Sequence, residues 1–422
     1  MAIANGTLWE VRTTGSQNAG GGFKDLDPGT SIDYSQQDSP QLTLTDLATD
    51  AAGTGLSSAT GGFTAAMVGN TMRISGGTLT AGWYQIVAFT STNLVTIDRS
   101  AGASKSGGSG YVGGAFLLGG SLDSAFLSTN SKGVSDIVYI KSGTYTTTTN
   151  VTCGNSGFSI RGYSTSRGSV PELSDRPVID LGSYYFTPGD YPVISDIIMC
   201  GTGTGDYGVL YITSGVGYPI ILRCKFQNNT AMANKPAVNM DTTLCHFVSC
   251  EFVSTSGYAV YVGTRTVAFV NCYFHDSVKG IYASSAKLYC ASSVFSNLTG
   301  SGIDYSYIAE HASVIGCVFY NCEYAFRDWR NATSVRSLLF INNIVTACAY
   351  GVYFDVSQLN PAHNAIDYNC WNTTIADVTN CFKGKNDIVG DPLLVDPANE
   401  DFRLQNSSPC INAGMQLSEA GL

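Results

Sequence analysis

Charged residues are scarce in this chain, and basic residues are the scarcer kind. Asp, Glu, Lys and Arg make up 13% of the 422 residues, and 32 acidic residues against 22 basic ones leave a formal net charge of -10. A surface that binds nucleic acid or an anionic membrane needs clustered Lys and Arg to pair with phosphates. We therefore expect neither a nucleic-acid partner nor a membrane partner.

The sequence also lacks the segments that export a protein or anchor it in a bilayer. No apolar run approaches the roughly 20 residues of a membrane-spanning helix, and residues 1–11 have neither the basic start nor the apolar core of a signal peptide. We expect synthesis in a cytoplasm without a signal peptide. The 13 cysteines would then be reduced thiols, and their odd number rules out complete internal pairing.

Proline is rare, with 12 residues, and almost no segment shows helical periodicity, whereas the chain has 47 glycines and 24 tyrosines. Tyrosine and β-branched residues favour strands, and glycine suits the tight turns between them. We therefore predict an all-β protein. Its length would suit two or three average domains, but a single elongated repeat fold also accommodates it.

A short phrase with a central cysteine or small polar residue recurs every 21 to 26 residues, and a second alternating strand follows most copies. Its period of two is that of a β-strand, so we expect Val270, Cys272 and Phe274, like their equivalents elsewhere, to point to one buried face. The copies are LRCKF (222–226), VSCEF (248–252), VNCYF (270–274), ASSVF (291–295), IGCVF (315–319), INNIV (341–345) and DYNCW (367–371).

Strand-rich units of this length are typical of a parallel β-solenoid, in which each unit forms one coil and like residues stack at about 4.8 Å. Propeller blades fit less well, because they need about four strands in ~40 residues. We predict about ten coils between residues 135 and 375.

The recurring cysteines are expected to fill space in the solenoid interior. Serine and asparagine replace cysteine in the same register, which a ladder of small side chains tolerates and a thiol catalyst or metal site does not. Disulfides between stacked coils remain an alternative, because a spacing near 4.8 Å lies within the permitted Cα range. The ladder positions are Cys224, Cys250, Cys272, Ser293, Cys317 and Asn343.

Three segments resemble right-handed parallel β-helix proteins of the pectate-lyase-like superfamily: LWEVRTTGSQNAGGGF (8–23), SLDSAFLSTNSKGVSDIVYIKSGTYT (121–146) and GKNDIVGDPLLVDPANEDFRLQNSSPCINAG (384–414). In that family the first strand, a capping helix and the second strand follow one another closely. Here about a hundred residues separate the first two segments, which implies an inserted β-domain and a helix over 121–130. We place the first strand and cap at 1–23, the inserted domain at 24–115, the coils at 116–380 and a C-terminal cap at 381–422.

The closing segment reads as a cap, since its prolines limit strand pairing and Asp391, Asp396 and Asp401 oppose edge-to-edge association. A calcium site among these aspartates is an alternative, although neither an EF-hand nor an RTX-type spacing is present.

The N-terminal block additionally resembles structural proteins of tailed-phage virions, through WEVRTTGS (9–16), DYSQQDSPQLTLTDLATD (33–50) and TGGFTAAMVGN (60–70). That resemblance implies a virion location, a homotrimer, and capsid or tail proteins as partners.

The second strands supply the candidate binding and catalytic residues. In register, their outward row reads Tyr261, Tyr282, Asp304, Arg327 and Tyr353, and the next outward positions include Trp329 and Asp355. Such a row suits a subunit interface or sugar binding by aromatic stacking. A glycosidase would need two carboxylates facing one cleft, for which Asp304, Asp355 and Glu310 are the weak candidates.

Other catalytic signatures are missing. The four histidines, at 246, 275, 311 and 363, show no His-x-His or His-x-x-x-His spacing, so we expect no metal site and no cofactor. Neither a Gly-x-Ser-x-Gly elbow nor a phosphate-binding loop occurs in a strand-to-helix context. Our hypothesis is a non-enzymatic virion structural protein, a capsid decoration or a short spike or fibre, with host-surface polysaccharide as a candidate ligand. The alternative is a tailspike depolymerase, a hydrolase or lyase of such a polysaccharide; a cell-surface adhesin fits less well without an export signal.

Overall fold

The computed structural model describes residues 5–118, 135–153, 157–189, 192–203, 205–213, 217–241, 244–264, 266–305, 311–329, 337–355 and 364–415. These residues form strands joined by turns and short 3₁₀ helices, which confirms the all-β prediction. The chain divides into two compact units, residues 1–180 with 188–198, and residues 181–187 with 199–422. Across the described ranges, no helix combines the length and apolarity needed to cross a bilayer.

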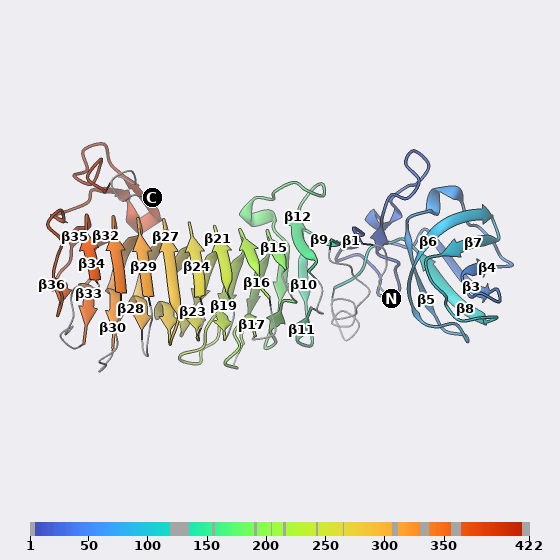
Figure 1. Cartoon of the computed structure of the whole chain (residues 1–422), viewed down its shortest axis with the longest axis horizontal. Helices are drawn as coiled ribbons and strands as arrows, with labels where there is room; N and C mark the ends of the chain where they lie inside the picture. Colours follow the sequence, from blue (N-terminus) through green and yellow to red (C-terminus); the bar gives the residue numbers. More distant parts are fainter. Residues whose placement is uncertain are drawn as a thin grey trace. The chain divides into compact units, whose positions relative to one another are not determined.

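The second unit is a parallel β-solenoid whose strands lie as successive rungs in Figure 1. Each coil has three short strands, for example β24 (Thr266–Val270), β25 (Tyr273–His275) and β26 (Lys279–Ala283). The predicted β-solenoid is thus confirmed.

The remaining coils of this unit repeat the same order. The first strands are β18 (Ile220–Leu222), β21 (Cys245–Val248), β27 (Lys287–Ala291), β29 (His311–Ile315), β31 (Ser337–Ile341) and β34 (Asn364–Asp367). The second strands are β19 (Lys225–Asn228), β22 (Glu251–Ser254), β32 (Ile344–Thr346) and β35 (Cys370–Asn372). The third are β17 (Leu210–Ile212), β20 (Val238–Met240), β23 (Tyr258–Val262), β33 (Tyr350–Phe354) and β36 (Ala376–Thr379), while β28 (Val294–Tyr305) and β30 (Val318–Asp328) serve as second and third strand together.

The predicted interior ladder is confirmed. All six of its side chains are buried, and beside them the rings of Phe226, Phe252, Phe274, Phe295 and Phe319 stack with centroids 4.6 to 5.6 Å apart. Burial raises the pKa of thiols such as Cys250 well above the usual range, which disfavours the thiolate that a nucleophile or metal ligand needs. The cysteines therefore act as small apolar side chains.

One part of the predicted register is wrong. Val270 was expected to share the buried face of Cys272 and Phe274, but 41% of its surface is exposed. The reason is Asn271, whose left-handed backbone (φ 54°) turns the chain between two strands and reverses the alternation of side chains. Equivalent left-handed residues stand at the same corner of neighbouring coils: Arg223, Ser249, Ser292, Gly316, Asn342 and Tyr368.

The C-terminal segment only partly follows the predicted cap. Strand β37 (Ile388–Val389) pairs with β35 and extends the stack. The hairpin of β38 (Leu394–Asp396) and β39 (Asp401–Leu404) instead lies against the side of earlier coils, where Phe402 contacts the rings of Tyr273 and Tyr320 at 6.2 and 5.9 Å. It therefore braces several coils laterally.

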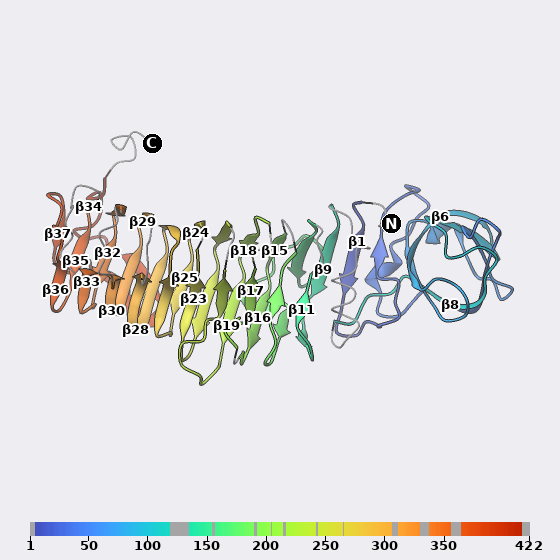
Figure 2. The ribbon, with the colours of Figure 1, turned by 60° about the horizontal axis from the view of Figure 1, so that its bottom comes forward.

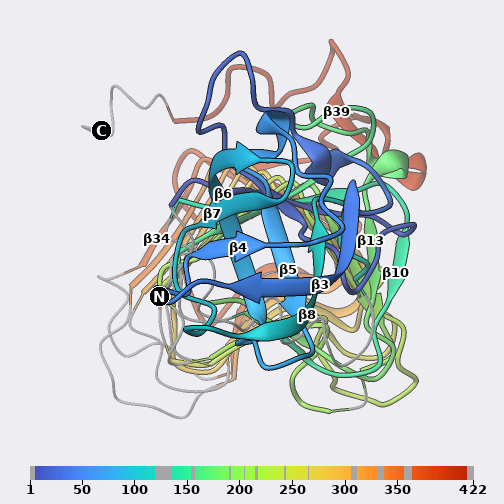
Figure 3. The same ribbon diagram turned by 90° about the vertical axis from the view of Figure 1, so that its right-hand side faces the viewer.

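The first unit contains a closed antiparallel barrel in the strand order β3-β4-β7-β6-β5-β8 (Figure 3). Its strands are β3 (Leu42–Thr49), β4 (Gly55–Ser57), β5 (Thr71–Ser75), β6 (Gly82–Ser91), β7 (Leu94–Ile97) and β8 (Ser106–Val112). Alternate side chains, among them Leu47, Met72 and Ile86, fill its interior. This barrel is the inserted β-domain predicted from the sequence.

The barrel interrupts two strands that are neighbours in the same sheet. Strand β1 (Leu8–Val11) pairs in parallel with β9 (Ile137–Lys141), and β2 (Gly22–Phe23) pairs with β1 antiparallel. Strand β12 (Ser159–Tyr163) adds to β9, and β15 (Val193–Ser195) adds to β12. In the second sheet of this unit, β10 (Thr144–Thr146) pairs in parallel with β13 (Val178–Asp180). The helix expected over 121–130 lies outside the described residues.

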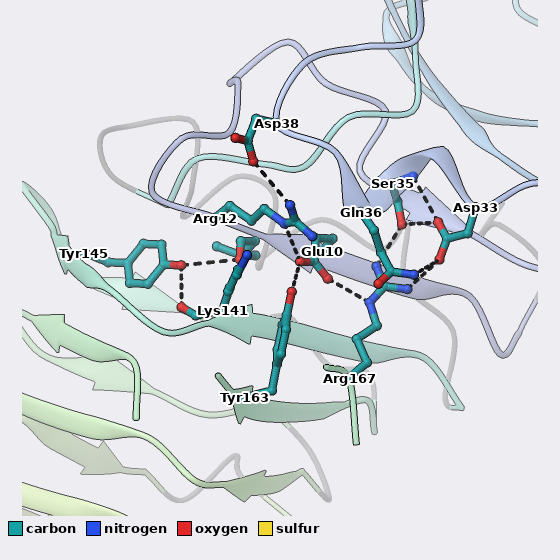
Figure 4. Close-up of polar contacts among 11 residues, drawn as sticks. Glu10, Arg12, Asp33, Ser35, Gln36, Asp38, Lys141, Tyr145, Tyr163 and Arg167 are labelled. Atoms are coloured by element: carbon teal, nitrogen blue, oxygen red, sulfur yellow. Dashed lines mark hydrogen bonds and ion pairs between the residues drawn. The ribbon is translucent and has the colours of Figure 1, made fainter. Parts of the chain in front are cut away.

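A buried charge network fastens the segment that leads to the barrel (Figure 4). The fully buried Glu10 carboxylate accepts hydrogen bonds from Arg12 Nε and Arg167 Nε, both at 2.7 Å, and from the Tyr163 hydroxyl. Arg167 also bonds Asp33 at 2.7 Å, at the start of the 3₁₀ helix η1 (Tyr34–Gln36). Because an unpaired buried carboxylate is costly, these cations fix β1, the β12 loop and η1 together.

Candidate functional site

One row of side chains runs along the third strands of successive coils, which lie side by side in Figure 2. These are the strands that the sequence analysis counted as the second of each unit. We call it the tyrosine row. The predicted register of its later members is confirmed, and it extends to two earlier residues. In order, its members are Tyr211, Asn239, Tyr261, Tyr282, Asp304, Arg327 and Tyr353.

Further tyrosines flank this row three positions earlier on the same strands. Tyr258 stacks on Tyr282 with centroids 4.6 Å apart, and Tyr324 stacks on Tyr350 at 4.9 Å. Tyr350 also contacts Tyr353 at 5.3 Å. Most of these rings are half-buried, so one edge or face of each meets solvent. We call the six residues Tyr258, Tyr261, Tyr282, Tyr324, Tyr350 and Tyr353 the tyrosine face.

Asp304 is not the exposed carboxylate that the sequence led us to expect. Its exposed fraction is 0%, and Lys279 Nζ lies 2.6 Å from its Oδ2. The Lys279 ammonium also lies 4.6 Å from the Tyr282 ring centroid and covers the carboxylate. Burial raises the pKa of Asp304, although Lys279, Arg327 and Trp329 act to lower it. The side chain of Asp304 thus points outward from its strand, but long side chains from adjacent coils cover it.

Arg327 joins the aromatic cluster at the next coil. Its guanidinium carbon lies 3.5 Å from the Trp329 ring centroid and 4.7 Å from that of Tyr324, which are cation–π distances. Its Nη2 contacts Asp355 at 3.4 Å. Trp329 itself is 44% exposed, so its ring is the apolar surface that this cluster presents to solvent, while Tyr324 is buried.

Both described candidate carboxylates are paired with cations. Glycoside hydrolysis needs an acid that can deliver a proton to the leaving oxygen and a second carboxylate facing the same bond. Asp304 is buried against Lys279, and Asp355 is held by Arg327. The third candidate, Glu310, lies outside the described residues.

Two histidines within the described ranges have side-chain partners. His275 bonds Glu251 at 3.0 Å and Asp276 at 2.8 Å; burial lowers its pKa, but these carboxylates outweigh burial and raise it overall. His311 contacts Ser337 at 2.6 Å. No group of three or more His, Cys, Asp or Glu among the described residues could hold a metal ion.

Sequence reasoning missed the flanking residues Tyr258, Lys279, Tyr324 and Tyr350. A signal for them exists, because Tyr258 pairs in register with Lys279 and Tyr324 with Tyr350, three positions before the tyrosine row. Only the contacts between coils show that Lys279 covers Asp304, since the two residues are 25 positions apart along the chain.

No protein-family model and no curated protein matches the chain. Among solved structures, ORF18 of Geobacillus virus E2 is 15% identical, and the match covers 60% of this chain and 55% of that one with a TM-score of 0.32. The catalytic domain of a GH87 α-1,3-glucanase is 11% identical (84% and 89% covered, TM-score 0.34), as is the tailspike protein gp49 of Pseudomonas phage LKA1 (82% and 67%, TM-score 0.29). The chain spans about half the length of the Geobacillus virus protein. At these identities and TM-scores the similarities carry no argument about activity.

Proposed function

We propose that this chain is a non-enzymatic structural protein of a tailed-phage virion, a capsid decoration or short spike, whose solenoid binds a surface polysaccharide. The observation that carries the binding role is the tyrosine face. Its half-buried rings recur along neighbouring coils, so their exposed parts are held at fixed spacing. Amphipathic tyrosines combine an apolar ring for the C–H face of a sugar with a hydroxyl for hydrogen bonding.

The virion assignment is supported by the N-terminal block, whose phrases resemble those of tailed-phage structural proteins. The barrel that this block builds is a separate module on which attachment to capsid or tail proteins would depend. We further propose that the chain assembles as a homotrimer in the particle.

Binding is tested by calorimetry with polysaccharide extracted from the surface of a susceptible host. We expect Tyr282→Ala with Tyr353→Ala to weaken binding about tenfold or more, because each lost aromatic contact is worth roughly 0.5–1.5 kcal/mol. Tyr289→Ala is the matched control, since Tyr289 is an exposed tyrosine on the first strand of a coil. Equal affinities for all three proteins would refute the proposal.

Catalysis is tested on the same polysaccharide by measuring new reducing ends or unsaturated products. We expect none, and no difference between the parent protein and Asp304→Asn with Asp355→Asn. Product formation that this double variant abolishes would instead establish the depolymerase.

Location is tested by the copy number of the chain in gradient-purified particles, measured by quantitative mass spectrometry against the major capsid subunit. A ratio near that of the capsid lattice identifies a decoration protein, and a few copies identify a spike. Absence from the particles refutes the virion assignment.

A further inference from the structure

A pocket opens at the start of the tyrosine row, in the same unit of the fold. Its volume is about 480 Å³, within the roughly 300–1,000 Å³ of small-molecule sites. Tyr207 and Tyr211 line it together with Tyr258 and Tyr261. Because Tyr258 stacks on Tyr282, the pocket is continuous with the tyrosine face.

The polar lining of the pocket is rich in hydrogen-bond acceptors. Asn239 is only 8% exposed, and its Oδ1 accepts no hydrogen bond from the described residues. Its Nδ2 donates to the backbone carbonyl of Asp206, which fixes the orientation of the amide. A buried acceptor without a donor is unfavourable, so a ligand that supplies an N–H or O–H group here would be stabilised.

The pocket also carries negative charge. Asp206 and Asp241 both line it, and Asp206 pairs with Lys235 at 2.5 Å. Asp241 instead accepts a hydrogen bond from the Tyr211 hydroxyl at 3.2 Å. That hydroxyl is neutral, because burial, followed by the nearby Asp241, raises the pKa of Tyr211 to about 12. The charge of Asp241 therefore stays available to a ligand.

We propose that this pocket binds a protonated amino-sugar residue of the glycan that lies on the tyrosine face. This inference rests on the proposed glycan-binding function. An ammonium group satisfies Asp241 and the Asn239 carbonyl oxygen, and the tyrosine rings favour a cation at their faces. A quaternary ammonium has no N–H to offer Asn239, and a uronic acid would be repelled by Asp241.

Calorimetry with a tetrasaccharide of glucosamine, its fully N-acetylated counterpart and an oligogalacturonate tests the proposal. We expect the glucosamine tetrasaccharide to bind about tenfold more tightly than the N-acetylated form at a pH where its amines are charged. The preference should vanish when the amines are deprotonated. Oligogalacturonate should bind most weakly of the three.

The isosteric variant Asp241→Asn should abolish the preference for the amino sugar, and Asn239→Leu should weaken its binding. Asp175→Asn, an exposed carboxylate on the 3₁₀ helix η3 (Leu173–Asp175), is the matched control and should change neither.

Equal affinity for the two tetrasaccharides, tighter binding of oligogalacturonate, or tighter binding of tetralysine than of glucosamine oligomers would overturn the inference. If the host polysaccharide still binds in a Tyr282-dependent way, the pocket inference alone has failed. If no saccharide binds, both proposals are refuted.

Discussion

Replacing Phe274 with alanine would remove the central ring of the solenoid interior. Phe274 is fully buried and lies between Phe252 at 4.8 Å and Phe295 at 4.6 Å, with interplanar angles of 9° and 4°. Loss of a buried phenylalanine costs about 3–5 kcal/mol through lost transfer energy and the cavity left behind. Since both ring faces are stacked, we expect a loss in the upper half of that range.

The neighbouring ladder position should behave differently. In the next coil Ser293 occupies the position of Cys272, and its hydroxyl lies 3.0 Å from both the Cys272 nitrogen and the Ala291 carbonyl oxygen. A serine therefore has partners in this environment, and Cys272→Ser should cost less than about 1.5 kcal/mol. The exposed Phe382→Ala should change the free energy of unfolding by less than about 0.5 kcal/mol.

Urea unfolding followed by circular dichroism and by tyrosine fluorescence measures these differences, provided that the two probes give the same transition. Equal losses for Phe274→Ala and Cys272→Ser would contradict the assignment of the thiols as interchangeable fillers. A loss below about 1.5 kcal/mol for Phe274→Ala would contradict the stacked core.

Three further outcomes are expected. Arg167→Met should lower the free energy of unfolding by about 3 kcal/mol, because Glu10 stays buried with one cation fewer. Adding Glu10→Gln should recover part of that loss, as measured by urea unfolding. A double variant as unstable as the single one would contradict the network. The raised pKa of His275 means that its charged form stabilises the fold below the unfolded value near 6.5, and that this contribution disappears as pH rises through the folded value. The melting temperature of His275→Gln should therefore vary less between pH 5 and 8 than that of the parent. Finally, Tyr282→Glu with Tyr353→Glu should leave the mass in light scattering unchanged, whereas dissociation would show that the tyrosine face is a subunit interface.

The interior of the solenoid could be predicted because stacking gives equivalent positions in successive coils the same environment. Cys250 and Cys272 fill equivalent sites, so their repetition in the sequence is a direct trace of the fold. The corner between strands could not be read in the same way. A left-handed residue such as Asn271 reverses the alternation without breaking the repeat, and Arg, Ser, Gly and Tyr serve at that corner in other coils.

Only part of the candidate site could be predicted from the sequence. The register of Asp304 and Arg327 followed from the repeat, but the burial of Asp304 depends on Lys279 reaching across from the preceding coil. The pocket was missed for a similar reason. Part of its lining, around Tyr207 and Asn234, comes from loops of unequal length that have no counterpart in the repeating phrase.

The segment that enters the barrel and the segment that leaves it lie close together, which bears on how the barrel could be replaced by another domain. Gly20 and Gly21 donate backbone hydrogen bonds to Gly113 and Gly114 at 2.8 and 2.9 Å, and Val11 forms a parallel bridge to Phe116. The two connections thus lie side by side where the chain enters and leaves the barrel. Cutting and rejoining the chain at these glycines would therefore remove the barrel while keeping the residues of β1 and β9 that pair with each other.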